Sequence, residues 1–152
     1  MRRIPLLLAL WIGIVTIPLW PQGQADGQPQ EGDPALLIGF TLSDLINRFG
    51  VPRSVYSVRG LQEWQDDVVF VYDEADFYII KDRVWQVGLK SAYLIRSGDS
   101  RAAVSSNFGE PLSSGEDYVI FPLRGNHWPL ALRCNFDSTG RVKAIFIYRL
   151  DI

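Results

Sequence analysis

The apolar and polar positions divide the chain into three stretches. Residues 4–20 form an uncharged apolar run, and residues 21–34 are rich in Gln, Gly, Pro and Asp with almost nothing apolar to bury. From about Ala35 onward, apolar residues recur at the spacing of helices and strands. Because a polar stretch cannot offset the entropy lost on ordering, we expect residues 26–36 to be a flexible linker and residues 37–152 a single folded domain.

The first clear element is a short amphipathic helix. Apolar residues at i, i+3, i+4 and i+7 predict it, namely Leu42, Leu45, Ile46 and Phe49. Thr41 is expected to cap this helix, with Asp44 completing a capping box. Gly50 suits the left-handed position that follows a helix, and Pro52 prevents continuation.

This helix segment occurs twice. The segment from Gly39 to Pro52 returns with the same spacing from Gly98 to Pro111, and each copy begins with Gly and ends with Phe-Gly-x-Pro. The second copy predicts a weaker helix at about 101–107, followed by Gly109 in the position of Gly50. A duplicated segment that precedes strands both times indicates a repeated supersecondary unit.

After each helix the apolar period changes from 3.6 to 2, which is typical of a half-buried sheet. The expected strands are 54–58, 68–72, 77–80, 84–89, 118–121, 130–136 and about 141–149. The alternation is clearest in the last two, whose expected apolar faces are Leu130, Leu132, Cys134 and Phe136 in one and Val142, Ala144, Phe146 and Tyr148 in the other. Turns at 81–82 and 137–140 are expected to join strands into hairpins.

This order of elements predicts an α+β fold made of two tandem helix-plus-antiparallel-meander units, at residues 37–95 and 96–152. The helices are expected to pack on one face of an antiparallel sheet. The expected structural positions are the ends of the duplicated segment, namely Gly39, Gly50, Pro52, Gly98, Gly109 and Pro111.

Residues 1–25 have the features of a signal peptide. Arg2 and Arg3 precede the apolar run, and small residues end at Ala25, where a signal peptidase would cut. This pattern predicts export, to the periplasm or as a secreted protein. The alternative is an uncleaved N-terminal anchor, through which the protein would contact the membrane, since about 17 to 25 apolar residues cross a bilayer as a helix.

Composition narrows the kinds of partner and cofactor. The formal net charge is −2 at pH 7 and no block of Lys and Arg is present, so the chain lacks the basic footprint of a nucleic-acid-binding protein. One His and one Cys cannot supply the usual ligands of a zinc site. A single Cys also permits no internal disulfide. We therefore expect no cofactor, no metal and no nucleic acid.

Two groups of residues were candidates for catalysis. Cys134 follows His127 by seven residues, but a catalytic pair needs an exposed thiolate, and the alternation places Cys134 on the apolar face of its strand. Acidic residues cluster at 66–67, 73–76 and 116–117, where turns and strand edges favour ordinary solvated side chains over a metal or acid–base site. We therefore expect no catalytic residues and no enzyme activity.

The candidate binding residues are loop aromatics and a basic hairpin. Trp64 and Trp128 fall in loops, where large rings either anchor a protein interface or fold back over the core. Arg133, Arg141, Lys143 and Arg149 share the C-terminal hairpin and could form a basic strip that meets an acidic partner, with the first three as the candidate binding residues.

The duplicated Gly-x-Thr/Ser segment ending in Phe-Gly-x-Pro, together with the closing Gly-Arg-Val hairpin, gives the chain a resemblance to known proteins. It resembles the tandem-repeat superfamily of β-lactamase inhibitor protein-like, SmpA-OmlA-like and YjgB-like exported proteins, over about residues 37–150. The resemblance implies an exported, non-enzymatic module that binds another exported or envelope protein. The alternative is a small-ligand or carbohydrate-binding protein that uses the sheet face and the loop aromatics.

Overall fold

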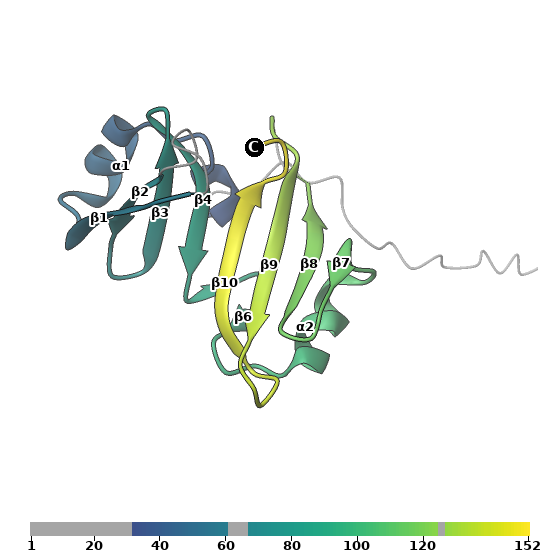
Figure 1. Ribbon diagram of the computed structural model, residues 1–152. Helices are drawn as coiled ribbons and strands as arrows, with labels where there is room; N and C mark the ends of the chain where they lie inside the picture. The colour runs from purple at the N-terminus through teal and green to yellow at the C-terminus, as the bar shows by residue number, and fades with distance from the viewer. Residues whose placement is uncertain (1–31, 61–66, 125–126) are drawn as a thin grey trace, which may run out of the picture.

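The computed structural model describes residues 32–60, 67–124 and 127–152 (Figure 1). The expected signal peptide and Trp64 lie outside the described residues. The elements in chain order are η1 (Pro34–Leu37), α1 (Leu42–Phe49), β1 (Ser54–Val58), β2 (Asp67–Val71), β3 (Ala75–Ile80), β4 (Arg83–Leu89), β5 (Ser91–Ala92), β6 (Ile95–Arg96), α2 (Arg101–Phe108), β7 (Ser113–Ser114), β8 (Tyr118–Leu123), β9 (Leu130–Phe136) and β10 (Val142–Arg149).

Eight of the strands form one antiparallel sheet in the order β1-β2-β3-β4-β10-β9-β8-β7, while β5 and β6 pair as a separate small hairpin. The centre of the large sheet is the pairing of β4 with β10, where Gly88 lies opposite Phe146 and Val87 opposite Ile147. Figure 1 shows these two strands side by side in the middle of the molecule, with α1 and α2 toward opposite ends of the sheet.

The predicted fold class is wrong. Over the residues that the structure describes, the protein is mostly sheet with two short α-helices, and these residues do not form two tandem helix-plus-meander units. Strand β4, from the first half of the chain, pairs with β10, from the second half. The two halves therefore share one sheet and one buried cluster. Sequence periodicity is a local signal and does not indicate which distant strands will pair.

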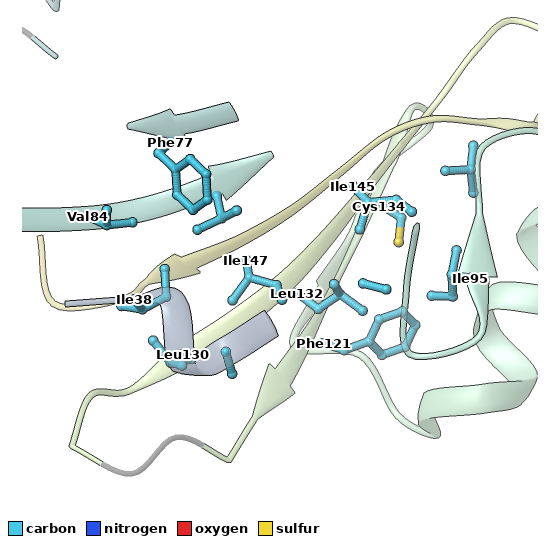
Figure 2. Close-up of a cluster of buried hydrophobic side chains, with 14 of the residues drawn as sticks. Ile38, Phe77, Val84, Ile95, Phe121, Leu130, Leu132, Cys134, Ile145 and Ile147 are labelled. Atoms are coloured by element: carbon cyan, nitrogen blue, oxygen red, sulfur yellow. The ribbon is translucent and has the colours of Figure 1, made fainter. Parts of the chain in front are cut away.

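The core lies on one face of this sheet. The pairing registers place Phe77, Val87, Ile147, Leu132 and Phe121 in a row across five strands, and all five side chains are buried. Ile38, which follows η1, Leu45 of α1 and Val104 of α2 belong to the same cluster. Figure 2 shows the middle of this cluster, where side chains from the sheet meet Ile38 and Ile95.

A register shift in β10 changes which of its residues are buried. The expected apolar face was Val142, Ala144, Phe146 and Tyr148, but the pairing with β9 is irregular between Val142 and Ala144. An extra residue at such a bulge reverses the inward and outward alternation. Ile145 and Ile147 therefore point into the core together with Val142, and Phe146 and Tyr148 lie on the opposite face.

The capping box of α1 and the glycines that follow both helices match the sequence predictions. Thr41 and Asp44 form a complete capping box at the start of α1, and Ser100 caps α2. Gly50 and Gly109 end the two helices with φ of 76° and 74°, respectively. L-residues rarely adopt such values, so glycine is required at both positions. Pro52 and Pro111 follow these glycines and prevent the helices from continuing.

Candidate functional site

The second face of the sheet carries aromatic and polar side chains. One row across the sheet consists of Tyr56, Val69, Tyr78, Gln86, Tyr148, Ala131 and Pro122. The next row consists of Ser54, Val71, Asp76, Gly88, Phe146, Arg133, Ile120 and Ser113. We call this surface the open face, because the buried residues of η1, α1 and α2 all belong to the cluster on the other side.

A pocket of about 220 Å³ lies on the open face where β3, β4 and β10 meet. Gly88 is part of its lining and lets the Phe146 ring approach the backbone closely, since a Cβ at this position would lie 3.3 Å from Cε1 of Phe146 and 3.6 Å from Cβ of Asp76. The rings of Tyr78 and Phe146 meet edge to face beside it, with centroids 6.3 Å apart. Lys90 and Lys143 contribute to the lining. We call this hollow the Gly88 pocket.

Burial shifts the acid–base behaviour of the groups around this pocket. Partial burial raises the pKa of Asp76, and the positive charge of Lys90 opposes that rise. Burial also raises the pKa of Tyr78 to about 12, with smaller contributions from Tyr56 and Asp76. A carboxylate whose pKa is raised by burial is one that lacks full compensation for its lost hydration.

The predicted basic strip does not form. The guanidinium of Arg133 stacks on Tyr118 at 4.7 Å from the ring centroid, and its Nε donates to Asn135 at 2.8 Å. Arg141 instead donates to the carbonyl oxygen of Gly98 at 2.9 Å, and Lys143 lines the Gly88 pocket. The three side chains therefore lie at three different places.

Trp128 packs back onto the domain. Its ring lies against the core cluster, and the guanidinium carbon of Arg149 is 3.7 Å from the ring centroid. A Cβ at Gly39 would lie 3.1 Å from Nε1 of Trp128. Of the two alternatives for this ring, the structure therefore shows the one in which it covers the core. The other candidate ring, Trp64, lies outside the described residues.

Cys134 is fully buried among apolar side chains, as the alternation predicts (Figure 2). Burial raises the pKa of its thiol to about 11, so the reactive thiolate is suppressed at neutral pH. His127 is exposed in the loop before β9. In the described part of the chain, no three His, Cys, Asp or Glu side chains gather where they could hold a metal ion.

A cluster of exposed apolar side chains lies beside β1, on the core side of the sheet. Ile46 and Phe49 of α1 are 44% and 39% exposed, and Val55 of β1 and Val68 of β2 are 50% and 41% exposed. The ring of Phe49 contacts Phe77 at 5.2 Å between centroids. Phe77 pairs with Phe70, which pairs with Val55, so the cluster is continuous across the sheet.

We call Ile46, Phe49, Val55 and Val68 the edge patch, and its exposure has a geometric cause. Eight strands at about 4.8 Å spacing make a sheet about 34 Å wide, whereas one helix covers about 10 Å. Only Leu45 of α1 is fully buried. The spacing of apolar residues in α1 predicts one apolar stripe, but two of its four residues, Ile46 and Phe49, remain exposed at the edge of the sheet.

The two edges of the sheet differ. Edge strand β7 has two residues, Ser113 and Ser114. Edge strand β1 has five residues, all of them exposed, and within the described part of the chain it pairs only with β2. Charged residues and prolines commonly protect an edge strand from pairing with another chain. Strand β1 contains neither.

The sequence carried one signal for the Gly88 pocket. A glycine inside a strand often marks a place where another group approaches the backbone closely. Gly88 falls within the expected strand 84–89, but its neighbours in the sheet are Asp76 and Phe146, which are far away in sequence. The pocket could be recognised only once the pairing of β3, β4 and β10 was known.

Comparison with solved structures identifies proteins of similar fold, among them two that match over most of this chain. One is a cysteine-rich secretory protein from Staphylococcus aureus subsp. aureus Mu50, with a TM-score of 0.51 and 11% identity over 81% of this chain and 48% of that chain. The other is an extracellular protein containing a SCP domain from Bacillus anthracis str. Ames, with a TM-score of 0.52 and 12% identity over 88% of this chain and 50% of that chain. At these identities the likeness shows a shared fold alone.

The chain spans about half the length of each of these two proteins. No protein-family model matches the chain, and no curated protein matches it. Among the described residues, no helix has the length and apolar character needed to cross a membrane.

Proposed function

We propose that this protein is an exported, non-enzymatic module that binds an extended, apolar segment of another exported protein along strand β1. The observation that supports this is the combination of a five-residue, fully exposed edge strand with the edge patch beside it. A segment that adds to a sheet edge gains main-chain hydrogen bonds from the edge strand and specificity from side chains at alternate positions. The edge patch offers apolar contacts for those side chains.

The chemistry of the patch favours a protein partner. Exposed apolar side chains scattered singly are ordinary, whereas a contiguous group marks an interaction site. The patch includes the aromatic ring of Phe49, which stays partly exposed although it packs on Phe77 and Tyr72. Aromatic rings of this kind supply much of the binding energy at protein interfaces.

Export is part of the proposal. An apolar run follows two arginines at the N-terminus, which is the pattern of a signal peptide. The two proteins of similar fold are described as secretory and extracellular. The sequence resemblance to exported protein-binding modules points in the same direction. We propose a secreted or periplasmic location for the folded domain.

A position-specific crosslinking experiment tests this function. A photoreactive phenylalanine analogue replaces Val55 in the full-length chain, and irradiation is carried out in the producing cells and their medium. We expect one dominant protein adduct. The matched control carries the analogue at Leu112, which is similarly exposed at the opposite end of the sheet and should give no such adduct.

A charge substitution then tests the patch itself. Val68→Lys places an ammonium group beside Val55 in the patch, and we expect it to reduce the adduct yield at position 55 at least fivefold. Leu150→Lys, which alters another exposed apolar residue, should leave the yield unchanged. Equal adducts from positions 55 and 112, or an adduct indifferent to Val68→Lys, would overturn the proposal.

A further inference from the structure

The Gly88 pocket combines opposite charges on its two sides. Strand β4 lies between β3 and β10, and Gly88 lets the ring of Phe146 lie close over the backbone of β4. Glu74 and Asp76 lie on the β3 side. Lys143 lies on the β10 side, and Lys90 follows the end of β4. The aromatic rings of Tyr78 and Phe146 form its apolar surface.

These charges are not neutralised by one another. Asp73, the third acid of the lining, pairs with Arg53. Within the described part of the chain, no ion pair engages Glu74 or Asp76, and none engages Lys90 or Lys143. Lys90 influences Asp76 only through its field. Two carboxylates and two ammonium groups are therefore available to a ligand.

We propose that the Gly88 pocket binds a small zwitterion of the amino acid or short peptide class. The ligand's ammonium group lies at Asp76 and against the rings of Tyr78 and Phe146, and its carboxylate lies at Lys143. Strands on either side of a central strand are about 10 Å apart, and two extended residues span about 7 Å. A dipeptide therefore fits between the two charged sides.

The aromatic rings strengthen the ammonium side. A cation over an aromatic face is attracted by the ring's negative face, and more strongly where water is excluded. Asp76 is half-buried, and no hydrogen bond engages it within the described residues. An ammonium group would supply the missing donor. The pocket lies on the opposite face from the edge patch, so this inference does not depend on the proposed protein partner.

Nuclear magnetic resonance titration of the full chain with L-alanyl-L-alanine tests the inference. We expect a saturable shift of the Gly88 amide signal. N-acetyl-alanyl-alanine, which lacks the ammonium group, and alanyl-alanine amide, which lacks the carboxylate, should each bind at least tenfold more weakly. Free L-alanine separates the two sources of the zwitterion: tighter binding than the dipeptide assigns an amino acid, and weaker binding assigns a peptide.

Three variants locate the ligand. Asp76→Asn and Lys143→Gln should each weaken binding at least tenfold, and Gly88→Ala should do the same by displacing the Phe146 ring that lines the pocket, without changing any charge. The charge-matched controls Glu116→Gln and Lys81→Gln alter exposed turn residues away from the pocket and should bind as the wild type does. Thermal unfolding confirms that each variant is folded. The inference is overturned if Gly88 shows no saturable shift, if the blocked peptides bind equally well, or if folded pocket variants keep full affinity.

Discussion

Arg83 donates a hydrogen bond from its guanidinium Nη1 to the carbonyl oxygen of Gly39 at 3.0 Å. The N–H of Gly39 in turn donates to the carbonyl oxygen of Val84 at 2.8 Å. The same pair of bonds recurs at Gly98, with Arg141 and Val142 as partners at 2.9 and 2.8 Å. The glycine before each α-helix is therefore hydrogen-bonded to a strand in the same way in both copies of the duplicated segment. Both strands belong to the same continuous sheet.

Substitutions at these two glycines separate backbone strain from crowding. Gly39 and Gly98 have φ of 90° and 92°, so Gly→Ala at either should destabilise the protein by about 1 kcal/mol through strain. Only at Gly39 would the new Cβ meet another group, Nε1 of Trp128 at 3.1 Å. We expect Gly39→Ala to cost more than Gly98→Ala in chemical denaturation. Equal losses, or a larger loss at Gly98, would contradict this packing of Trp128.

Cys134 is expected to act as a core residue. Cys134→Ala should destabilise by about 1 to 2 kcal/mol because it removes buried packing, and Cys134→Ser should cost more because its hydroxyl enters apolar surroundings. Burial raises the pKa of the thiol to about 11, so the folded protein holds the thiol proton more tightly than the unfolded chain does. The stabilisation from the buried neutral thiol is therefore fully present below the unfolded pKa and is lost as pH rises through 11. Rapid, stoichiometric alkylation of the folded protein by iodoacetamide at pH 8 would refute this placement.

The capping box of α1 should show a pH-dependent contribution. Hydrogen bonds from the side chain and backbone of Thr41 lower the pKa of Asp44 below its ordinary value of 3.8. A lowered folded-state pKa means that the contribution is present above 3.8 and is lost as pH falls through the folded pKa. Asp44→Asn should therefore be less stable than wild type at pH 7, and the difference should shrink at pH 2.5.

A second substitution identifies the source of that pH dependence. In a Thr41→Val background, the hydroxyl that lowers the Asp44 pKa is gone. Asp44→Asn should then change stability much less between pH 7 and pH 2.5. If the effect of Asp44→Asn has the same size at both pH values in the wild-type background, the hydrogen bonds to Thr41 do not control the ionisation of Asp44.

The turn between β5 and β6 holds two non-glycine residues with positive φ. Tyr93 and Leu94 have φ of 49° and 69°, and Leu94 is 91% exposed. Because Leu94 buries almost nothing there, Leu94→Gly should stabilise the protein by about 0.5 kcal/mol or more by removing strain. Tyr93 is different, since its hydroxyl donates to Asp33 at 2.6 Å. Leu112→Gly is the control at an exposed leucine without positive φ and should give no gain in denaturant unfolding.

The parts of the structure that sequence could predict are those set by neighbours in the chain. The capping box of Thr41 and Asp44 and the positive φ of Gly50 depend on residues within a few positions. The pairing of Gly88 with Phe146 joins distant strands, and no periodicity encodes it. The pairing of β4 with β10 joins the two halves of the chain into one sheet. The prediction of two separate units was wrong because local sequence patterns do not show which distant strands pair.

The candidate sites were harder to predict for the same reason. Phe49 has the spacing of a core residue, and its partial exposure follows only from how little of the sheet α1 covers. Lys143 has the alternation of an outward-facing strand residue, but the bulge beside it and the sheet order bring it to the rim of the Gly88 pocket. In both cases, contacts between distant parts of the chain determine where the side chain lies and how exposed it is.

Amide hydrogen exchange tests directly whether the partner forms main-chain hydrogen bonds with strand β1. Exchange is measured with and without the protein captured at position 55. If the partner adds to the sheet edge, amide exchange in Ser54–Val58 should slow at least tenfold in the complex. Exchange at Ser113 and Ser114 of the opposite edge should stay unchanged. Unaltered exchange in β1, with protection confined to other elements, would show that the partner does not bind there.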